Sequence, residues 1–398
     1  MSDPLAPIID RLIDEALGSS NFEPMFVDAC TEFDKNVFPL CRAHVSMTTL
    51  HPLFDVTSMT WNRDRDIRHT TFTRADDSNQ DWINSPFYQM MDIDHVYSRY
   101  FDLSETDHGY PVLKELRESG ATGYYAVLHG FVYPPEDAIE KKDGMITSWA
   151  TDKPGGFDED AIAAIKRMVS RLAVCAKLCV REATANNILH AYLGPDAGRR
   201  VLDGQIKLGD GESIQAAIWY SDMRNSTPLA DRLPREVFLA LVNAYFDATA
   251  TAVIDAGGEV LRFIGDAVLG IFRIDEKRTR EQAALAALNA AKTAVMRMES
   301  YNRSAVEQGG EPFDLGIALH VGEVIFGNIG IPSRVEFSVI GSAANETARL
   351  EGLNKEFGSR VVLSDTLVSA LPGTDGLSDK GEQTLRGVGH PIRVYTTI

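Results

Sequence analysis

The sequence predicts an α+β protein in which two sheet-containing domains are joined by a long helix. The chain has 398 residues, too many for one compact core at about 150 residues per domain. Hydrophobic residues make up 44% and charged residues 24%, as in ordinary globular chains. Both halves mix turn-bounded apolar runs with helical patterns, and one central stretch keeps helical spacing throughout. We expect a first domain at 1–156, a helical connector at 157–211 and a second domain at 212–398.

The first domain has the pattern of a sheet with flanking helices. Four apolar runs are predicted as strands: CRAHVSMTTL, VTSMTW, TGYYAVLHGFVY and GMITSWA. Helices are predicted over 22–36 and 111–119. Aromatic residues of this domain are candidates for the wall of a ligand pocket, although aromatic residues in sheet domains are more often plain core. These residues are Trp61, Trp82, Tyr88, Tyr124, Tyr125 and Trp149.

The connector begins after a Pro-Gly-Gly turn, where Asp158, Glu159 and Asp160 place negative charge in the first turn of a helix. Spacings of three and four then alternate, which predicts a parallel coiled-coil seam and hence a homodimer. A helix packed on its own domain's sheet explains the first half of the run equally well. The seam residues are Ile162, Ile165, Val169, Leu172, Ala176, Cys179, Ala183 and Asn186. The glycine-broken segment LGPDAGRRVLDG is predicted to be an adjustable joint.

The second domain shows a cleaner pattern. A strand at 214–220 precedes an amphipathic helix that two glycines end, and a hairpin then turns at Gly265-Asp266. An alanine-rich helix at 280–300 follows, then the strand DLGIALHV and further strands around the helix SAANETARLEGLNKEF. This order predicts a ferredoxin-like β-α-β-β-α-β core with extra strands.

Two carboxylates of this domain are placed for phosphate chemistry. Asp222 directly follows an apolar strand and precedes a loop that opens a helix, and Asp266 lies in the hairpin turn. If the strands are neighbours, both carboxylates converge at one sheet edge and can hold two divalent cations. Taken singly, Asp222 is as well explained as a helix cap and Asp266 as a turn aspartate.

Four sequence segments, which follow one another in this order, support the interpretation of Asp222 and Asp266 as a functional pair: AAIWYSDMRNST, EVLRFIGDAVLGIF, IALHVGEVIFGNIG and EFSVIGSAANETARLEG. Together they resemble the catalytic domain of class III nucleotidyl cyclases, over about residues 212–398. The resemblance implies cyclisation of a nucleoside triphosphate with release of pyrophosphate, two Mg²⁺ or Mn²⁺ ions per site, and a homodimer with its sites at the interface. It implies metal binding by Asp222, Asp266 and the Met223 carbonyl. The amides of Asn225, Ser226 and Thr227 are implied to bind the triphosphate. Asn345 and Arg349 are implied to orient the ribose and stabilise the transition state.

The sequence departs from that family at several positions. Asn225-Ser226 replaces the usual Gly-Phe pair, and Asn is the non-glycine residue that best tolerates a left-handed backbone. Adenylate-specific members carry Lys four residues before the second metal aspartate and guanylate-specific members carry Glu. The cation at Arg262 and the hydroxyl at Ser338 therefore favour adenine, although Arg does not replace Lys freely and another base stays open. Arg386 matches a basic residue near the phosphates or is a solvated loop arginine.

The segment GMITSWATDKPGGFDEDAIAAIKRM resembles part of a GAF-type sensory domain. This resemblance implies that residues 1–156 bind a small molecule, which the sequence does not identify. The whole chain is then expected to be a regulated adenylate cyclase. The alternatives are a guanylate or other nucleotidyl cyclase, or a catalytically silent nucleotide-binding signalling module.

Charge and composition exclude several other classes. Basic residues number 39 and acidic residues 57, giving a net charge of −18 that repels nucleic acid and anionic lipid. No apolar run approaches the roughly 18 residues of a membrane helix, and the N-terminal segment is acidic. We expect a cytoplasmic protein without a membrane span or nucleic-acid partner. His320 is expected to be structural. The four cysteines are expected to be reduced core thiols: Cys30, Cys41, Cys175 and Cys179.

Overall fold

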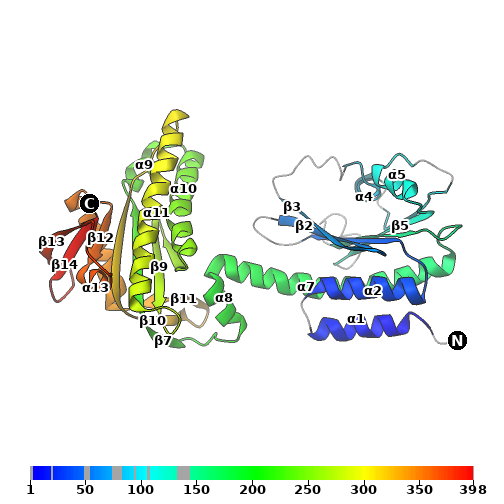
Figure 1. The fold of residues 1–398 in the computed structure, drawn as a ribbon, viewed down its shortest axis with the longest axis horizontal. Coiled ribbons are helices and arrows are strands. Elements are labelled where there is room, and N and C mark those ends of the chain that lie inside the picture. The colour runs from blue at the N-terminus through cyan, green and yellow to red at the C-terminus, as the bar shows by residue number, and fades with distance from the viewer. Residues whose placement is uncertain are drawn as a thin grey trace. The chain divides into compact units, whose positions relative to one another are not determined.

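The computed structural model describes residues 3–18, 21–48, 54–73, 83–93, 96–104, 108–131 and 144–397 (Figure 1). Trp82, one of the aromatic candidates, lies outside these ranges. The chain divides into two compact units, Met1–Ala191 and Tyr192–Ile398. The predicted connector is therefore shared between the two units and does not form a body of its own.

The first unit contains one mixed set of helices and strands. In chain order they are α1 (Ala6–Gly18), α2 (Phe22–Asn36), β1 (Arg42–Thr48), β2 (Phe54–Asn62), β3 (Arg65–Thr73), α4 (Pro86–Tyr88), the π-helix η1 (Gln89–Ile93), β4 (Ser98–Asp102), α5 (Pro111–Glu118), β5 (Gly123–Gly130), β6 (Gly144–Thr151) and α7 (Glu159–Leu193). The strands form an antiparallel sheet in the order β3-β2-β1-β6-β5-β4.

Both faces of this sheet are covered. Trp149 is fully buried against Phe26 and Phe33 of α2, in a core that α1 and α7 complete. On strand β5 Tyr125 lies opposite Trp149 in the same core, whereas the preceding Tyr124 points to the other face, where α4, η1 and α5 pack. Successive residues thus enter different cores, as the two-residue strand period requires. Trp61, Tyr124, Tyr125 and Trp149 are all buried core residues, which agrees with the plainer of their two interpretations.

The strands and helices predicted for this unit are present, but the sequence reasoning missed five elements: α1, β3, α4, η1 and β4. Strands β3 and β4 lie at the two edges of the sheet. An edge strand carries charged residues such as Arg65 and Arg68 that hide the apolar alternation of a strand. Helix α1 was missed because its segment was considered only as a possible leader, although Ile8, Ile9 and Leu12 are buried in the core.

Helix α7 begins where its acidic first turn predicted, and the Asp158 carboxylate accepts a hydrogen bond from the Ala161 amide at 2.8 Å. The predicted coiled-coil seam is wrong for most of its length. Its central side chains are 0–5% exposed and belong to the core of their own unit: Ile165, Val169, Leu172, Ala176 and Cys179. The alternative interpretation, a helix packed on its own domain, holds here because a spacing of three and four serves either kind of burial.

The predicted joint after α7 is also corrected. Residues Pro195–Leu202 form helix α8. Its Asp196 accepts hydrogen bonds from Arg200, and Arg200 also donates to Glu212 at 2.9 Å. Arg273 of the neighbouring strand donates to the same Glu212 carboxylate. These ion pairs connect α8 to the sheet of the second unit, so this segment is anchored there.

The second unit continues with β7 (Gly211–Met223), α9 (Ser226–Arg232), α10 (Arg235–Asp255), β8 (Glu259–Ile264), β9 (Ala267–Ile274), α11 (Arg280–Glu307), β10 (Leu315–Ile331), β11 (Arg334–Ile340), α12 (Ser342–Phe357), β12 (Val361–Ser364), α13 (Asp365–Val368), β13 (Leu377–Gln383) and β14 (Ile392–Thr397). The sheet order is β13-β14-β12-β10-β7-β9-β8, with β11 paired to β10. The segment β10-β7-β9-β8 has the strand order of a ferredoxin-like fold, as predicted.

Helices α10 and α11 cover one face of this sheet and α12 packs on the other (Figure 1). Trp219 of β7 faces α10 and α11, whereas its neighbour Ile218 faces the opposite side. Among the described residues, α10 is long and apolar enough by length and composition to cross a membrane. Its buried residues, such as Tyr245 and Val253, pack in the sheet core, so we assign it as a core helix.

The four cysteines are free thiols, as predicted. Cys30, Cys175 and Cys179 are buried and Cys41 is half-buried.

Candidate active site

Asp222 and Asp266 converge at one end of the central strands. Asp222 is the penultimate residue of β7, opposite Gly316 of β10 and Ala267 of β9. Asp266 lies in the turn between β8 and β9. The two carboxylates are close enough for the charge of Asp266 to raise the pKa of Asp222, and the Met223 amide donates to the Asp266 carbonyl at 3.3 Å. The structure therefore brings together the two carboxylates that the sequence paired.

Buried polar contacts support the β7 end beneath Asp222. The Trp219 indole N–H donates to Ser221 Oγ at 3.2 Å, and that oxygen lies 2.9 Å from the Tyr245 hydroxyl of α10. All three residues are fully buried. A fully paired buried network of this kind holds a strand end in one position.

The carboxylates are arranged for a cation. Burial, together with the neighbouring charges of Asp266 and Glu351, raises the pKa of Asp222 to about 7. Like charges placed together inside a protein disfavour ionisation unless a positive partner arrives. Glu351 itself has a raised pKa because it is buried. The site thus concentrates negative charge, which Arg224 and Lys355 partly offset at Glu351.

Sequence reasoning missed Glu351. It lies on α12, and a side chain at the facing Gly316 would collide with its carboxylate, so the glycine leaves the room that Glu351 occupies. The sequence held a partial signal for this residue, because Glu351 stands two residues after Arg349 in the last of the four quoted segments. Its approach to Asp222 depends on how α12 crosses the sheet, which no local pattern gives.

Asn225 adopts the left-handed conformation that its identity predicted, with φ 56° and ψ 28°. It is the N-cap of α9, and its carbonyl accepts the first helical hydrogen bond from the Leu229 amide at 3.1 Å. Ser226 and Thr227 occupy the first turn, whose amides have no acceptor within a helix. The loop after Asp222 therefore presents donor groups although it lacks the usual glycine.

Asn345 and Arg349 lie one turn apart on the exposed side of α12, as predicted from their spacing. Residues on the opposite side of the same helix, such as Thr347 and Leu350, are fully buried. Arg349 is close enough to Tyr220 of β7 to affect its pKa. Both side chains are accessible for contact with a ligand or a second chain.

The two base-selection candidates are in different environments. Arg262 of β8 forms an ion pair with Glu336 of β11, with Nη2 and Oε2 2.5 Å apart. Ser338, its predicted companion, is 2% exposed. Glu336 is thus the acidic neighbour of Arg262, and sequence reasoning missed it because the pairing joins two strands that are far apart in the chain.

Arg386 is exposed in the turn between β13 and β14. Strand β14 is separated from β7 by β12 and β10, which at about 4.8 Å per strand places it roughly 14 Å away. The structure therefore does not bring Arg386 to Asp222 within one chain.

Comparison with known proteins assigns this unit. Residues 211–397 match the model of the adenylate and guanylate cyclase catalytic domain. These residues form a cyclase catalytic domain. The adenylate cyclase of Anabaena cylindrica is 29% identical over 199 residues, covering 48% of this chain and 38% of that protein. An uncharacterized protein of Mycobacterium bovis is 34% identical over 244 residues, covering 61% of this chain and 41% of that protein.

The crystal structure of the adenylyl cyclase CyaB from P. aeruginosa superposes with a TM-score of 0.44 at 23% identity, covering 48% of this chain and 96% of that one. The chain spans well under half the length of the curated relatives named above.

The donor set of the cyclase domain fits a hard divalent cation that also binds phosphate. Within the described ranges, no group of three or more His, Cys, Asp or Glu side chains is arranged to hold a metal. A pair of carboxylates is nevertheless what Mg²⁺ commonly uses, because it completes its shell with water and substrate phosphates. Asp222, Asp266 and the Met223 carbonyl supply such a pair with one further oxygen.

Proposed function

We propose that the chain is an adenylate cyclase that converts ATP to cyclic AMP and pyrophosphate. The observation that carries this proposal is the convergence of Asp222 and Asp266 at a sheet end of the cyclase domain, where the charge of Asp266 raises the pKa of Asp222. A catalytically silent module has no need of two carboxylates held in mutual repulsion. The relative from Anabaena cylindrica is named an adenylate cyclase, which supports the choice of reaction.

The proposed mechanism assigns a task to each residue. Asp222, Asp266 and the Met223 carbonyl would hold two Mg²⁺ or Mn²⁺ ions. The chemistry that these ions supply when bound is activation of the ribose 3′-hydroxyl and neutralisation of phosphate charge. The amides of Ser226 and Thr227, with Asn225 shaping their loop, would donate to the triphosphate.

Asn345 would orient the ribose, and the Arg349 guanidinium would stabilise the charge that develops at the α-phosphate. Their exposure on α12 fits a site completed by a second copy of the chain, in which one subunit supplies the carboxylates and the other supplies this pair. Arg386, which is remote from Asp222 in its own chain, would reach phosphates only in the partner's site. We therefore propose a homodimer with two equivalent sites.

Adenine is the proposed base. The Arg262 guanidinium donates hydrogen bonds only, which suits the ring-nitrogen acceptors of adenine. Its ion pair with Glu336 fixes its direction, and the Glu336 carboxylate can accept from an exocyclic amine. Ser338 would take part only if the strand moved, because it is buried. GTP is the alternative substrate.

The dimer proposal needs a seam different from the one predicted. The outward side of α7 exposes four large apolar residues: Val174 (60%), Leu178 (50%), Ile188 (43%) and Tyr192 (84%). With Arg181 and Ala185 they continue a spacing of four and three, so they share one stripe of the helix. We call these six residues the α7 stripe and propose that two copies of it pair.

We further propose that the first unit is a GAF-like sensory domain that binds a small molecule and regulates the cyclase, in the cytoplasm. Its layered antiparallel sheet supports this assignment. A ligand can act only if it binds one state of the dimer more tightly than another.

The deciding experiment offers the purified chain ATP, GTP, CTP and UTP separately, with Mg²⁺ or Mn²⁺, and separates the products by chromatography. Cyclic AMP should dominate. A clear excess of cyclic GMP would overturn the choice of base, and no cyclic nucleotide from any substrate would favour the silent module.

A further inference from the structure

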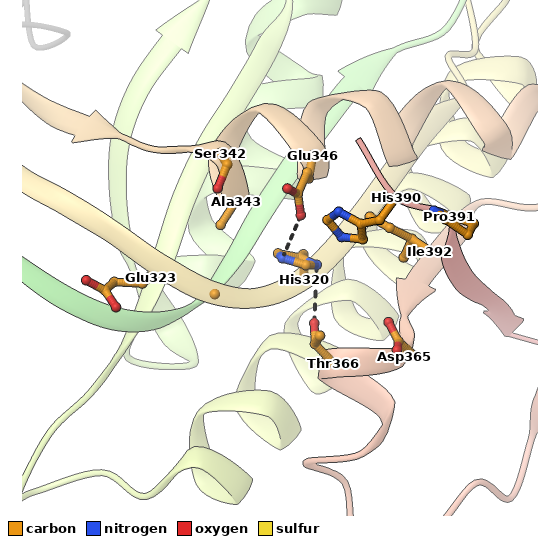
Figure 2. Close-up of a pocket in the computed structure, with 11 residues that line it drawn as sticks. His320, Glu323, Ser342, Ala343, Glu346, Asp365, Thr366, His390, Pro391 and Ile392 are labelled. Atoms are coloured by element: carbon orange, nitrogen blue, oxygen red, sulfur yellow. Dashed lines mark hydrogen bonds and ion pairs between the residues drawn. The ribbon is translucent and has the colours of Figure 1, made fainter. Parts of the chain in front are cut away.

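His320 is a buried residue that the proposed mechanism leaves unused. It lies on β10 and is 4% exposed. Its Nε2 is 3.5 Å from Glu346 Oε2 of α12, and its Nδ1 is 3.2 Å from Thr366 Oγ1 of α13. Figure 2 shows the ring between these two side chains, so His320 connects three elements of the cyclase domain.

The partners of His320 determine where its proton lies. Burial lowers the pKa of His320 to about 4, so the ring is neutral at pH 7 and carries one N–H. A carboxylate only accepts hydrogen bonds, so the proton is on Nε2 and points to Glu346. Nδ1 then accepts from the Thr366 hydroxyl.

The chain of hydrogen bonds continues with one consistent direction. The Thr366 oxygen accepts from the Val321 amide at 3.3 Å and lies 2.9 Å from Ser364 Oγ, which accepts from the Leu367 amide. The Ser364 hydroxyl proton is thus available to the Thr366 oxygen. Every donor from the Leu367 amide to the Thr366 hydroxyl has an acceptor, and the 3.5 Å contact between His320 Nε2 and Glu346 extends this chain to α12. A buried polar network paired in this way is rigid.

Glu346 is the point where this network meets the candidate active site. It lies in the early part of α12, directly after Asn345 and three residues before Arg349. Its carboxylate side chain is 13% exposed and turned inward, whereas Asn345 and Arg349 are exposed.

The beginning of α12 is packed on one side only, where the buried Ala343 lies against Gly322 of β10. The N-cap residue is Gly341, which makes no side-chain cap. A cavity of about 290 Å³ lies beside the first turn, lined by Ser342, Ala343 and Glu346 of α12 and by His390 and Ile392 near β14 (Figure 2). The other side of the first turn, which carries Glu346, faces this cavity, and the Glu346–His320 contact crosses that space.

We propose that His320 is a positioning residue: held by Thr366, it fixes Glu346 and so sets the orientation of the α12 turn that carries Asn345 and Arg349. This inference rests on the proposed cyclase function for its kinetic consequence. A shift of about 1 Å in a group that acts on the transition state can cost about 100-fold in rate. The expected signature is a loss in kcat with little change in KM.

Two substitutions separate the two contacts of His320. In His320→Gln the amide nitrogen can occupy the place of Nε2 and still donate to Glu346. In His320→Asn the amide is shorter and reaches only the place of Nδ1, so the contact to Thr366 can persist while Glu346 loses its donor. We expect kcat for ATP to fall about 10- to 100-fold in His320→Asn and about threefold or less in His320→Gln, with KM within about twofold in both.

Two further variants test whether the effect of His320 passes through Glu346 and whether it is confined to this chain of contacts. Glu346→Ala should resemble His320→Asn, and the double variant should be no slower than either single one, because both remove the same contact. His390→Gln is the matched control, since His390 lines the same cavity but lies outside the chain of contacts, and its kcat should equal that of the wild type. Equal losses in His320→Asn and His320→Gln at equal thermal stability would overturn the proposal, as would additive losses in the double variant.

Hydrogen exchange measured by mass spectrometry tests whether His320 holds the α12 turn in place, and this measurement does not depend on turnover. The peptide covering residues 341–349 should exchange faster in His320→Asn than in His320→Gln or the wild type. Equal exchange in the two variants would overturn the positioning role. If the wild type makes no cyclic nucleotide, the proposed function fails, whereas this exchange comparison still gives its own answer about α12.

Discussion

Asp152 in the first unit and Asp222 in the second occupy comparable places, each at the end of a central strand of its sheet. Asp152 accepts a hydrogen bond from Arg63 at 2.7 Å, and this contact lowers its pKa. Asp222 instead faces Asp266 and Glu351, and burial with these charges raises its pKa to about 7. The first sheet end is neutralised within the fold, whereas the second keeps negative charge that only a cation from outside can neutralise.

This difference shows where folding and function compete in the molecule. In the first unit Arg63 pairs with both Asp34 and Asp152, and aromatic residues fill both faces of the sheet, Trp149 on one and Tyr124 on the other. In the second unit the fold holds two carboxylates in an unfavourable arrangement, which the proposed reaction would require. The predictions below test that contrast, beginning with the largest expected effect.

Removing either carboxylate should abolish turnover and leave the fold intact. Asp222→Ala or Asp266→Ala is expected to lower kcat by about 1,000-fold or more, because each removes a ligand that the cations need. The oligomeric state by size-exclusion chromatography with light scattering and the circular dichroism spectrum should match the wild type. Retained turnover in either purified variant would show that a different carboxylate binds the metal.

The division of the site between two chains gives the next effect. Asp222→Ala and Arg349→Ala should each be inactive alone. After mixing and subunit exchange, half the molecules are heterodimers with one complete site, so activity should recover to about a quarter of the wild type. The measurement is cyclic AMP formation before and after exchange. Exchange demonstrated without any recovery would mean that each site is built within one chain.

The sequence predicted the carboxylate pair because local patterns carry it: each aspartate follows an apolar strand or sits in its turn. It also predicted the left-handed Asn225, since backbone tolerance is a property of the residue itself. Glu351 and Glu336 were missed because their contacts depend on how α12 crosses the sheet and on an ion pair between β8 and β11, which are not neighbours in the sheet. The face of α7 was misjudged for a related reason. Two stripes of that helix have equally regular spacing, and only tertiary packing decides which one is buried.

The α7 stripe gives a smaller effect and separates these two faces. Leu178→Glu with Ile188→Glu should weaken the dimer and lower activity about tenfold, because like charges would then meet across the seam. Ala183→Glu is the matched control, since it is exposed on the opposite side of the helix and belongs to the seam predicted from sequence. Sedimentation velocity measures both. Dissociation by Ala183→Glu alone would restore the first interpretation.

The smallest effect is on stability, and it should have opposite signs at the two strand ends. The folded pKa of Asp222 is about 7 against an ordinary 3.8, so the folded state binds the extra proton and loses stability as pH rises from about 4 to 7.

Asp222→Asn removes that loss of stability. Without metal at pH 8 it should stabilise the protein by on the order of 1 kcal/mol, after allowance for solvent screening, and raise the Tm of the second unit by a few degrees. The gain should be much smaller near pH 4, where Asp222 is protonated in the folded state and already partly protonated in the unfolded state, and should shrink when Mg²⁺ is added. Asp152 has a lowered pKa, so the stability that it contributes is present above its unfolded pKa, and Asp152→Asn should lower the Tm of the first unit at pH 8.

Thermal unfolding of both variants with EDTA at pH 4 and pH 8 provides the comparison. A lower Tm for Asp222→Asn at pH 8 would mean that the carboxylate is neutralised by a group of the protein itself, and the contrast between the two sheet ends would then be wrong.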